Sequence, residues 1–244
     1  MDDAMSLVNV FFQQNAMNLV ALLWFFLCFR GYMIYAKKAM YTTPCLSSVL
    51  HMYRHEWMVK LHERENRIAD NAGIANLERS VSFFASTTML ILAGLMTVLG
   101  STDKAIDVIA DIPFAVQATR EEWEIKIVMM IVLFVYAFFK FTWSLRQYGF
   151  VTVMIGGVPR PADGVSAQVC QANAARIAKM TSLAANNFNN GLRTYYFSQA
   201  MLGWFINPVL FMGLSTLIVY ILYRREFKSS TLKTLMMSVE PDTK

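Results

Sequence analysis

Residues 81–100 read VSFFASTTMLILAGLMTVLG, twenty consecutive residues without a charged side chain. An α-helix rises about 1.5 Å per residue, so this segment is long enough to cross the roughly 30 Å hydrocarbon core of a bilayer. In lipid every backbone polar group needs an internal partner, and a helix supplies one along its length. The segment therefore predicts a transmembrane helix.

Three further stretches have the length and composition of membrane spans. One lies within residues 8–36, one covers 125–145 and one covers 200–223, where Asn207-Pro208 predicts a kink. The composition agrees, because 56% of the residues are hydrophobic, 16% are charged and the mean hydropathy is +0.38. These values exclude a disordered chain and disfavour a soluble enzyme. We predict an all-α polytopic membrane protein with about four transmembrane helices, formed as a single domain over residues 1–244.

Charge divides the connecting segments into two kinds. The segments between the first and second spans and between the third and fourth spans carry an excess of Lys and Arg, whereas the segment after the second span is mainly acidic. Because cytoplasmic loops are enriched in Lys and Arg, the N-terminus and the acidic loop are predicted to face the periplasm of a bacterial inner membrane. The net charge of +5 then reflects topology, and we expect the lipid bilayer, not nucleic acid, as its partner.

The polar tail, residues 224–244, does not fit this topology. Four crossings would leave it outside, yet it begins with Arg224 and Arg225, which favour the cytoplasm. A further crossing near residues 150–158, a stretch that is short for a span, would place the tail inside. The sequence leaves both topologies open.

The two basic segments are predicted to contain helices. Residues 47–69 place apolar side chains at helical spacing, which predicts an amphipathic cytoplasmic helix that ends near residues 71–73. A turn at 159–164 precedes a second helix at 165–185, whose many small residues favour close packing. On the outer side, residues 107–117 are expected to form a short surface helix.

The two halves of the chain resemble each other at an offset of about 115 residues. Arg30 and Tyr32 follow the first span much as Arg146 and Tyr148 follow the third. Residues 8–100 and 124–222 would then be repeat halves that enter the membrane in the same direction, with a pseudo-two-fold axis along the membrane normal. The alternative is that Arg and aromatic residues simply collect at membrane interfaces.

The three histidines of the chain fall within one predicted helix. His51, His55 and His62 are spaced i, i+4 and i+11, and Glu65 follows. Histidines four residues apart on a helix can share a metal ion, and a carboxylate can complete the ligand set. The alternative is a solvated polar stripe on a charged surface helix.

Four arginines occupy the predicted cytoplasmic ends of the spans: Arg30, Arg79, Arg146 and Arg193. Gathered around an axis they would favour anions in a pore, or they would bind lipid headgroups. The alternative is ordinary anchoring of the spans. Lys140 lies inside the third span, where a charge is a functional candidate unless it extends to the nearby interface.

Amide side chains provide a weaker indication of a polar path through the membrane. Amides inside spans prefer helix contacts or water over lipid, and the candidates are Gln13, Gln14, Asn18 and Asn207. The chain has no phosphate-binding loop, no hydrolase nucleophile motif and no haem-attachment motif. We therefore expect no enzymatic activity and no cofactor.

Several short motifs resemble one known family. They are Arg-His-Glu-Trp-Met at 54–58, Leu-Glu-Arg-Ser at 77–80, Arg-Gln-Tyr at 146–148 and Gly-Leu-Arg-Thr-Tyr-Tyr-Phe at 191–197, with Trp204 beyond them. The chain resembles the domain-of-unknown-function 599 family of small bacterial and plant membrane proteins, from about Arg30 to Tyr223. The resemblance implies a polytopic helical protein without an established activity and supplies no active-site residues.

Three functions remain open from the sequence. The first is a structural or accessory membrane protein that forms a homo-oligomer or joins a larger membrane complex. The second is a homo-oligomeric channel or transporter for a small ion, an anion if the four arginines line the path. The third is a metal-binding membrane protein that uses the histidines.

Overall fold

The computed structural model describes the backbone of residues 2–110, 119–159 and 163–237, and side chains from residue 16 onward apart from residues 109–118 and 160–162. This part of the chain is α-helical and contains no strand. It therefore confirms the all-α prediction. The helices are α1 (Asp2–Thr42), α2 (Leu46–Leu61), α3 (Ile68–Gly100), α4 (Thr102–Ala110), α5 (Arg120–Gly156), α6 (Ala167–Ile206), α7 (Pro208–Phe227) and α8 (Ser230–Leu235).

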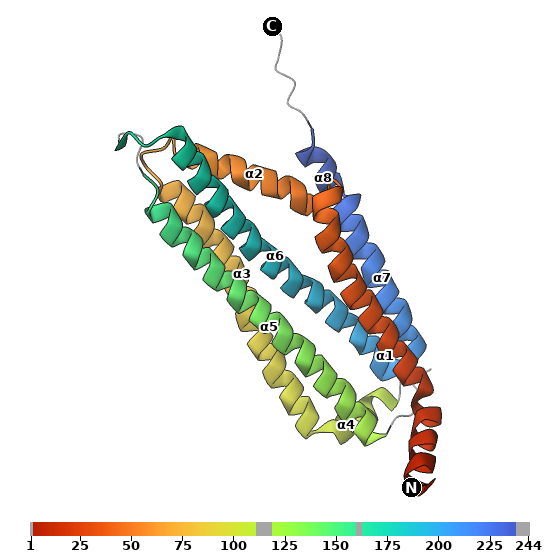
Figure 1. Cartoon of the computed structure of the whole chain (residues 1–244). Coiled ribbons are helices and arrows are strands. Elements are labelled where there is room, and N and C mark those ends of the chain that lie inside the picture. Colours follow the sequence, from red (N-terminus) through yellow and green to blue (C-terminus); the bar gives the residue numbers. More distant parts are fainter. Residues whose placement is uncertain (1, 111–118, 160–162, 238–244) are drawn as a thin grey trace.

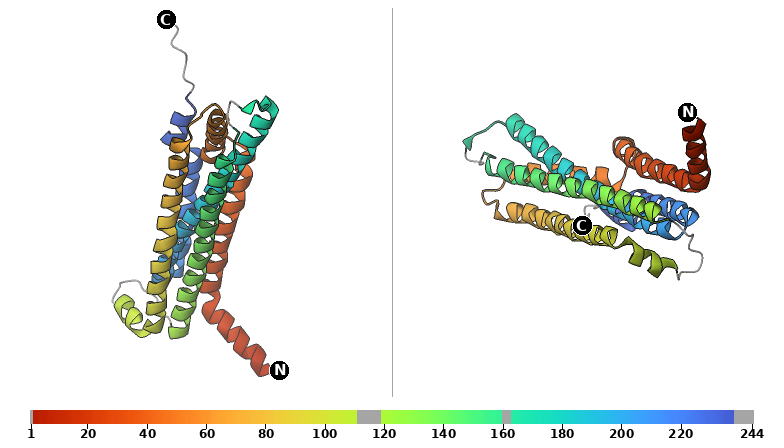
Figure 2. Two further views of the ribbon diagram at one scale, coloured as in Figure 1. Left: turned by 90° about the vertical axis from the view of Figure 1, so that its left-hand side faces the viewer. Right: turned by 90° about the horizontal axis from the view of Figure 1, so that it is seen from below.

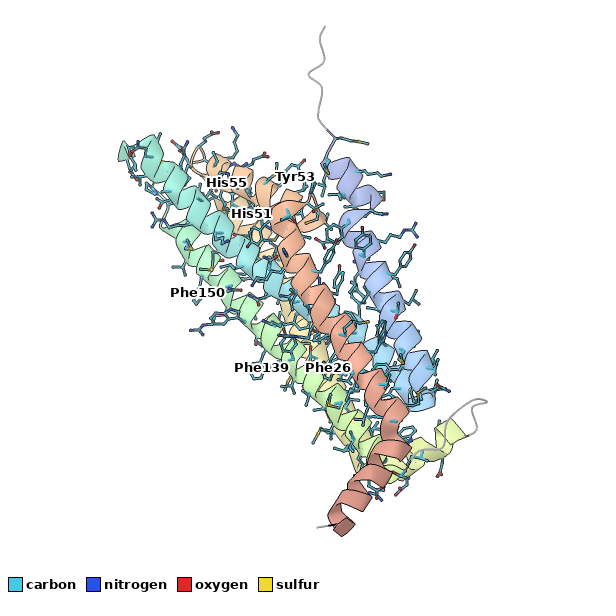
Figure 3. All side chains as sticks on the ribbon, turned by 45° about the vertical axis from the view of Figure 1, so that its right-hand side comes forward. Phe26, His51, Tyr53, His55, Phe139 and Phe150 are labelled. Atoms are coloured by element: carbon cyan, nitrogen blue, oxygen red, sulfur yellow. The ribbon has the colours of Figure 1, made fainter. Side chains whose placement is uncertain are left out.

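Four helical segments in the described chain are long and apolar enough to cross a membrane, as predicted. They are Ala16–Thr42 in α1, Ile68–Gly100, Arg120–Gly156 and Pro208–Leu235. Figure 1 shows α1 beside α7 and α3 beside α5, and both pairs are in direct contact. Apolar side chains remain exposed on the outer face of these helices, including Phe139 and Phe150 in Figure 3, as expected for surfaces that face lipid.

Helix α6 lies between the two pairs and packs mainly on α5 and α7 (Figure 1). The sequence predicted a cytoplasmic helix at 165–185 and a separate span at 200–223. This division is wrong, because α6 is continuous over 40 residues. Small buried residues such as Ala178, Ser182 and Gly191 let α6 sit close to its neighbours. Since α6 is enclosed by other helices, it does not need the hydropathy of a lipid-facing span.

The kink predicted at Asn207-Pro208 is a reversal of chain direction. Asn207 has an extended backbone, with φ −158° and ψ 134°, and ends α6. Its side chain accepts a hydrogen bond from the Val209 backbone N–H at 2.7 Å and so caps α7, while Pro208 occupies the first turn. α7 therefore runs back alongside α6 (Figure 1).

Lys126 of α5 supports this reversal from the side. The last carbonyls of a helix lack intrahelical donors, and Pro208 has no N–H to offer. The buried Lys126 ammonium donates to the Trp204 carbonyl at 3.1 Å and lies 5.5 Å from the centre of the Trp204 ring. The Trp204 indole N–H donates in turn to the Asn18 side chain at 2.9 Å. These contacts join α1, α5 and α6 at the end of the bundle where α4 lies.

The reversal places the start of α1 and the end of α8 at opposite ends of the bundle (Figure 1). α2, α8, the end of α5 and the start of α6 share the end at which α7 finishes, whereas α4 and the start of α1 lie at the other (Figures 1 and 2). α6 runs the length of the bundle in addition to the four apolar helices, so the chain crosses the bundle five times. Arg224 and Arg225 therefore lie at the same end as the basic segments. Residues 150–156 belong to the end of α5 and form no separate crossing.

The amphipathic helix predicted at 47–69 is shorter than expected. α2 ends at Leu61, and residues 71–73 lie inside α3 instead of ending a helix. Asp70 fixes the turn between them, since it accepts hydrogen bonds from the Trp57 indole at 2.7 Å and from Arg64 at 2.6 Å. Gly73 permits this contact, because a Cβ there would meet the Trp57 ring at 3.3 Å.

The repeat of residues 8–100 on 124–222 stays a prediction. The break at residues 62–67 corresponds, at the offset of 115, to residues 177–182, where α6 is continuous. The surface helix predicted at 107–117 is represented by α4, which starts earlier, at Thr102. Residues 111–117 of that prediction lie outside the described part of the chain.

Candidate functional site

A cavity of about 460 Å³ opens between α1 and α5, with α6 as its floor. We call it the outer cavity. Arg30 and Lys37 of α1, Lys140 of α5 and Arg193 of α6 contribute four cationic groups to its lining, and no acidic side chain of the described chain lines it. Two of them, Arg30 and Lys37, are exposed. This imbalance of charge favours an anion.

The floor of the outer cavity adds neutral hydrogen-bonding groups. Asn186 and Asn187 lie in one turn of α6 and Asn190 in the next, and all three line the cavity. Lys140 donates to the Asn187 side chain at 3.4 Å and lies 5.4 Å from the centre of the Tyr136 ring. The amide nitrogen of Asn187 already donates to Gln147 and to the Leu183 carbonyl, which leaves the amides of Asn186 and Asn190 as the donors that a phosphate or carboxylate needs beside the cations.

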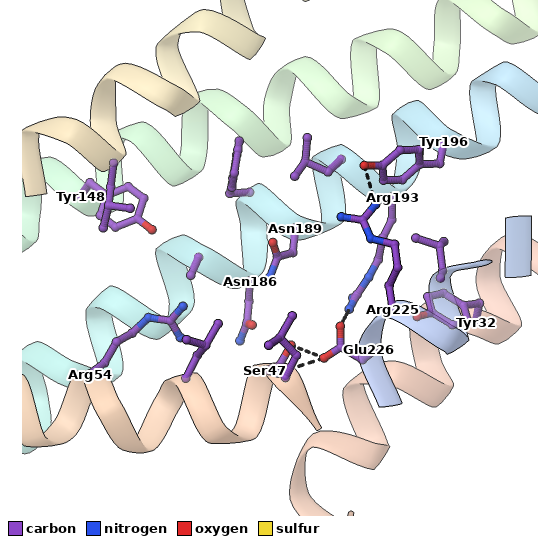
Figure 4. A pocket seen from close by; sticks show the side chains of 17 residues that line it. Tyr32, Ser47, Arg54, Tyr148, Asn186, Asn189, Arg193, Tyr196, Arg225 and Glu226 are labelled. Atoms are coloured by element: carbon purple, nitrogen blue, oxygen red, sulfur yellow. Dashed lines mark hydrogen bonds and ion pairs between the residues drawn. The ribbon is translucent and has the colours of Figure 1, made fainter. Parts of the chain in front are cut away.

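A second cavity, of about 230 Å³, lies beneath α2 (Figure 4). We call it the inner cavity. Arg54 and Tyr148 stand toward one side of it and Glu226 toward the other, with Asn186 and Asn189 between them. Its lining also includes three residues shared with the outer cavity, which are Ser47, Asn186 and Arg193.

A network around Glu226 forms the boundary between the two cavities. Arg193 and Glu226 make an ion pair at 3.4 Å, and each side chain is only 13% exposed. The second carboxylate oxygen accepts from the Ser47 hydroxyl at 2.6 Å and from the Ser47 backbone N–H at 3.0 Å. Glu226 therefore ties the end of α7 to the start of α2 and to the middle of α6.

Arg225 also lines the inner cavity, next to Glu226. Its guanidinium donates to the Tyr196 hydroxyl at 2.8 Å and stacks over the same ring at 5.3 Å. Arg193 likewise lies 5.6 Å from the centre of the Tyr32 ring. Both arginines are thus oriented by aromatic faces, and of the two only Arg193 also has an acidic partner among the described residues, Glu226.

Arg54 of α2 has a different environment. No acidic side chain of the described chain lies within ion-pairing distance of it. Burial lowers the pKa of the Arg54 guanidinium, and the nearby Tyr148 opposes this shift. An arginine stays protonated even so. Arg54 therefore presents a partly buried positive charge to the inner cavity.

The structure brings together three of the five basic residues singled out from the sequence. Arg30, Lys140 and Arg193 share the outer cavity. Arg79 is exposed on α3 and does not line it, and Arg146 is exposed on α5, stacked 5.6 Å from the centre of the Phe150 ring. The four arginines therefore do not surround a common axis within one chain.

Of the four predicted amides, the structure describes the side chains of Asn18 and Asn207, and the polar path stays a prediction. Asn18 accepts from Trp204, and Asn207 caps α7. The side chains of Gln13 and Gln14 lie outside the described part of the structure. Beyond Arg193 toward the α4 end, the interior is filled by buried apolar side chains: Phe25, Phe29, Phe197, Met201, Trp204 and Phe211.

The histidines do not form a metal site in the described residues. No group of three or more His, Cys, Asp or Glu side chains with the arrangement to hold a metal ion is found there. His51 contacts the Ser182 hydroxyl at 2.8 Å, and His55 is exposed on α2 (Figure 3). Burial, together with the positive charges of Lys179 and Arg54, lowers the pKa of His51. The cations near His51 also oppose a bound metal ion. His62 and Glu65 belong to no group of metal ligands among the described residues.

Sequence reasoning missed Arg54, Ser47 and Glu226. One signal was available, because Glu226 is the only acidic residue between Asp163 and Glu240. A lone carboxylate in so basic a stretch indicates a structural ion pair. Arg54 offered no comparable signal, because its isolation depends on which residues of α5 and α6 pack beneath α2.

These features define the class of the protein as a multi-pass helical membrane protein with a cationic cavity near one end of its bundle. A family profile described as "Protein of unknown function, DUF599" matches residues 20–231, which is most of the chain. The chain belongs to this family. No curated protein and no solved structure matches it.

Proposed function

We propose that this protein binds the anionic headgroup of a membrane phospholipid in the outer cavity and serves as an accessory protein of the membrane. One observation carries the proposal, which is that four cationic side chains and, among the described residues, no acidic one line a cavity between two membrane-spanning helices. Because α1 and α5 both face the bilayer, a lipid reaches this cavity by lateral diffusion. Its volume of about 460 Å³ suits a small-molecule ligand.

The height of the cavity along the helices supports a headgroup as ligand. On α5 the uninterrupted apolar stretch runs from Ile127 to Phe139 and ends at Lys140. Arg79 on α3 and Arg30 on α1 likewise mark the end of the apolar part of their helices. Basic residues at this height lie near the lipid phosphates, where each contributes about 1 kcal/mol to binding an anionic lipid.

Replacement of Lys140 tests the proposal. Lys140→Gln removes one of four charges and keeps a polar side chain, so we expect affinity for phosphatidylglycerol to fall by about tenfold. Titration with lipid, followed by native mass spectrometry of the detergent-solubilised protein, measures this. Arg146→Gln is the matched control, because it removes a cation from the exposed face of the same helix. Equal losses in both variants, or none in either, would contradict a specific site.

We further propose that the end carrying α2 and α8 faces the cytoplasm of a bacterial inner membrane. The basic segments and Arg224-Arg225 share this end, while the acidic residues around α4 share the other, which follows the positive-inside rule. In a Cys170→Ser background, we expect Asp107→Cys to react with a membrane-impermeant thiol reagent in right-side-out vesicles. Thr231→Cys should react only after permeabilisation, and the opposite pattern would reverse the topology.

A conducting path within one chain is not favoured by this packing. The buried core toward the α4 end contains Phe25, Phe29 and Phe197, whose rings lie 5.3–6.0 Å apart between centres. An anion channel would need an axis between several copies of the chain. The accessory role and any homo-oligomer or larger complex remain part of the proposal, with the lipid as the partner that the chemistry supports best.

A further inference from the structure

Resting on the proposed lipid-headgroup function, we infer that the ligand is a phospholipid whose headgroup carries hydroxyl or acidic groups beyond its phosphate. In this arrangement the phosphate occupies the outer cavity, and the distal part of the headgroup occupies the inner cavity beneath α2.

The two cavities share part of their lining. Ser47, Asn186 and Arg193 line both of them, so a group held at these residues touches both spaces. Arg193 is oriented by the Tyr32 ring, by an acceptor on Asn190 at 3.2 Å and by its ion pair with Glu226 at 3.4 Å. A phosphate beside Arg193 would therefore leave its substituent directed either along α1 toward lipid or past Ser47 into the inner cavity.

The chemistry of the inner cavity selects the distal group. Amide, hydroxyl and phenol groups from Asn189, Ser47 and Tyr148 provide donors and acceptors that suit a polyol. Arg54 lies at the far side from Glu226 and has no acidic partner among the described residues (Figure 4). A hydroxyl or carboxylate that reaches Arg54 would form a charge-assisted hydrogen bond, which is stronger than one between neutral groups.

The same lining disfavours a cationic distal group. Arg54, Arg193 and Arg225 oppose the single carboxylate of Glu226, and that carboxylate is already occupied by Arg193 and Ser47. A choline or ethanolamine headgroup would place a positive charge among these arginines. The volume of the inner cavity, about 230 Å³, also limits the size of the distal group. The cavity accommodates a small polar group and is too short for an acyl chain.

The test compares two lipids with the same phosphodiester charge. Phosphatidylglycerol carries distal hydroxyl groups, and phosphatidylmethanol carries only a methyl group. We expect the purified full-length protein to bind phosphatidylglycerol about tenfold more tightly, in titrations followed by native mass spectrometry. Arg54→Gln should remove this preference and leave binding of phosphatidylmethanol unchanged, whereas Lys140→Gln should weaken both lipids equally.

Two further variants separate binding from folding. Lys60→Gln is the charge-matched control on α2, because Lys60 is exposed and pairs with Glu63, and it should keep the preference. Arg54→Lys keeps the charge and should retain part of it. Thermal unfolding of each variant in the same detergent shows whether the fold is intact, and only variants with an unchanged midpoint are compared.

The outcomes distinguish the inference from the function beneath it. Equal binding of both lipids, with Lys140→Gln weakening each, would overturn the inference and leave the lipid function standing. If the protein binds neither lipid, both the inference and the proposed lipid function are overturned. If glycerol 3-phosphate binds with the same dependence on Arg54 while neither lipid does, the source of the anion is a soluble phosphate and the lipid assignment is wrong.

Discussion

Gly191→Ala is expected to destabilise the protein by about 1–3 kcal/mol, although alanine is the better helix former. A Cβ at position 191 would lie 2.8 Å from the Cδ1 and Cζ atoms of Phe141 and closer still to its Cε1 atom. Phe141 cannot move away, because it is fully buried between Phe84, Phe188 and Tyr195, with ring centres 5.5–5.8 Å away. The added methyl group therefore separates α6 from α5.

The measurement is SDS-induced unfolding of the purified protein in mixed micelles. Gly149→Ala on α5 is the control, because a Cβ there meets nothing within 4 Å, and helix propensity alone should stabilise it by up to about 1 kcal/mol. Phe141→Leu should relieve the clash, so the double variant should lose less stability than the sum of the two single variants. Purely additive losses would mean that Gly191 does not act through Phe141.

Gly191 belongs to α6, the helix of the bundle that the sequence divided wrongly, whereas α1, α3, α5 and α7 were predicted as spans. α3, α5 and α7 face lipid, so their apolar residues run without interruption and are recognised by length and hydropathy. α6 faces other helices, and its contacts use small and polar groups such as Ser144 on α5, whose hydroxyl donates to the Ala184 carbonyl at 2.7 Å. Such a helix resembles a soluble one until its neighbours are known.

The candidate site was predictable in part for a related reason. Arg30 and Lys140 each end an apolar stretch and Arg193 precedes one, which is a local signal of the membrane interface. Their gathering into one cavity, and the exclusion of Arg79 and Arg146, depends on which face of each helix turns inward. In a lipid-facing helix, apolar residues occupy both the inner and the outer face. The sequence therefore does not determine how the helix is rotated about its own axis.

The contacts of Glu226 required the reversal at Asn207. With a kinked fourth span, α7 would end at the opposite side of the membrane, far from Ser47 at the start of α2. The capped turn returns α7 to that side and brings the Glu226 carboxylate within 2.6 Å of the Ser47 hydroxyl. The geometry of two residues, Asn207 and Pro208, therefore decides both the topology of the tail and the boundary of the inner cavity.

Lys126→Met is expected to destabilise the protein by about 2–4 kcal/mol, because it removes a support of this turn. Lys126 is 4% exposed, and its ammonium group provides the donor for the Trp204 carbonyl at 3.1 Å. Without it the carbonyl stays buried and unpaired, and the contact of the cation with the indole face is lost. The substitution also removes the positive charge that lies near the C-terminus of α6, where the helix dipole has its negative end, and this adds to the destabilisation.

Unfolding in SDS, followed by tryptophan fluorescence, measures this loss. Lys104→Met serves as the control, because Lys104 is exposed on α4 at the same end of the bundle and the substitution removes the same charge. We expect that variant to unfold within about 0.5 kcal/mol of the native protein. If Lys126→Met were as stable as native protein or more so, the cost of burying the ammonium would exceed the value of its contacts, and the α6–α7 turn would owe its geometry to Asn207 and Pro208 alone.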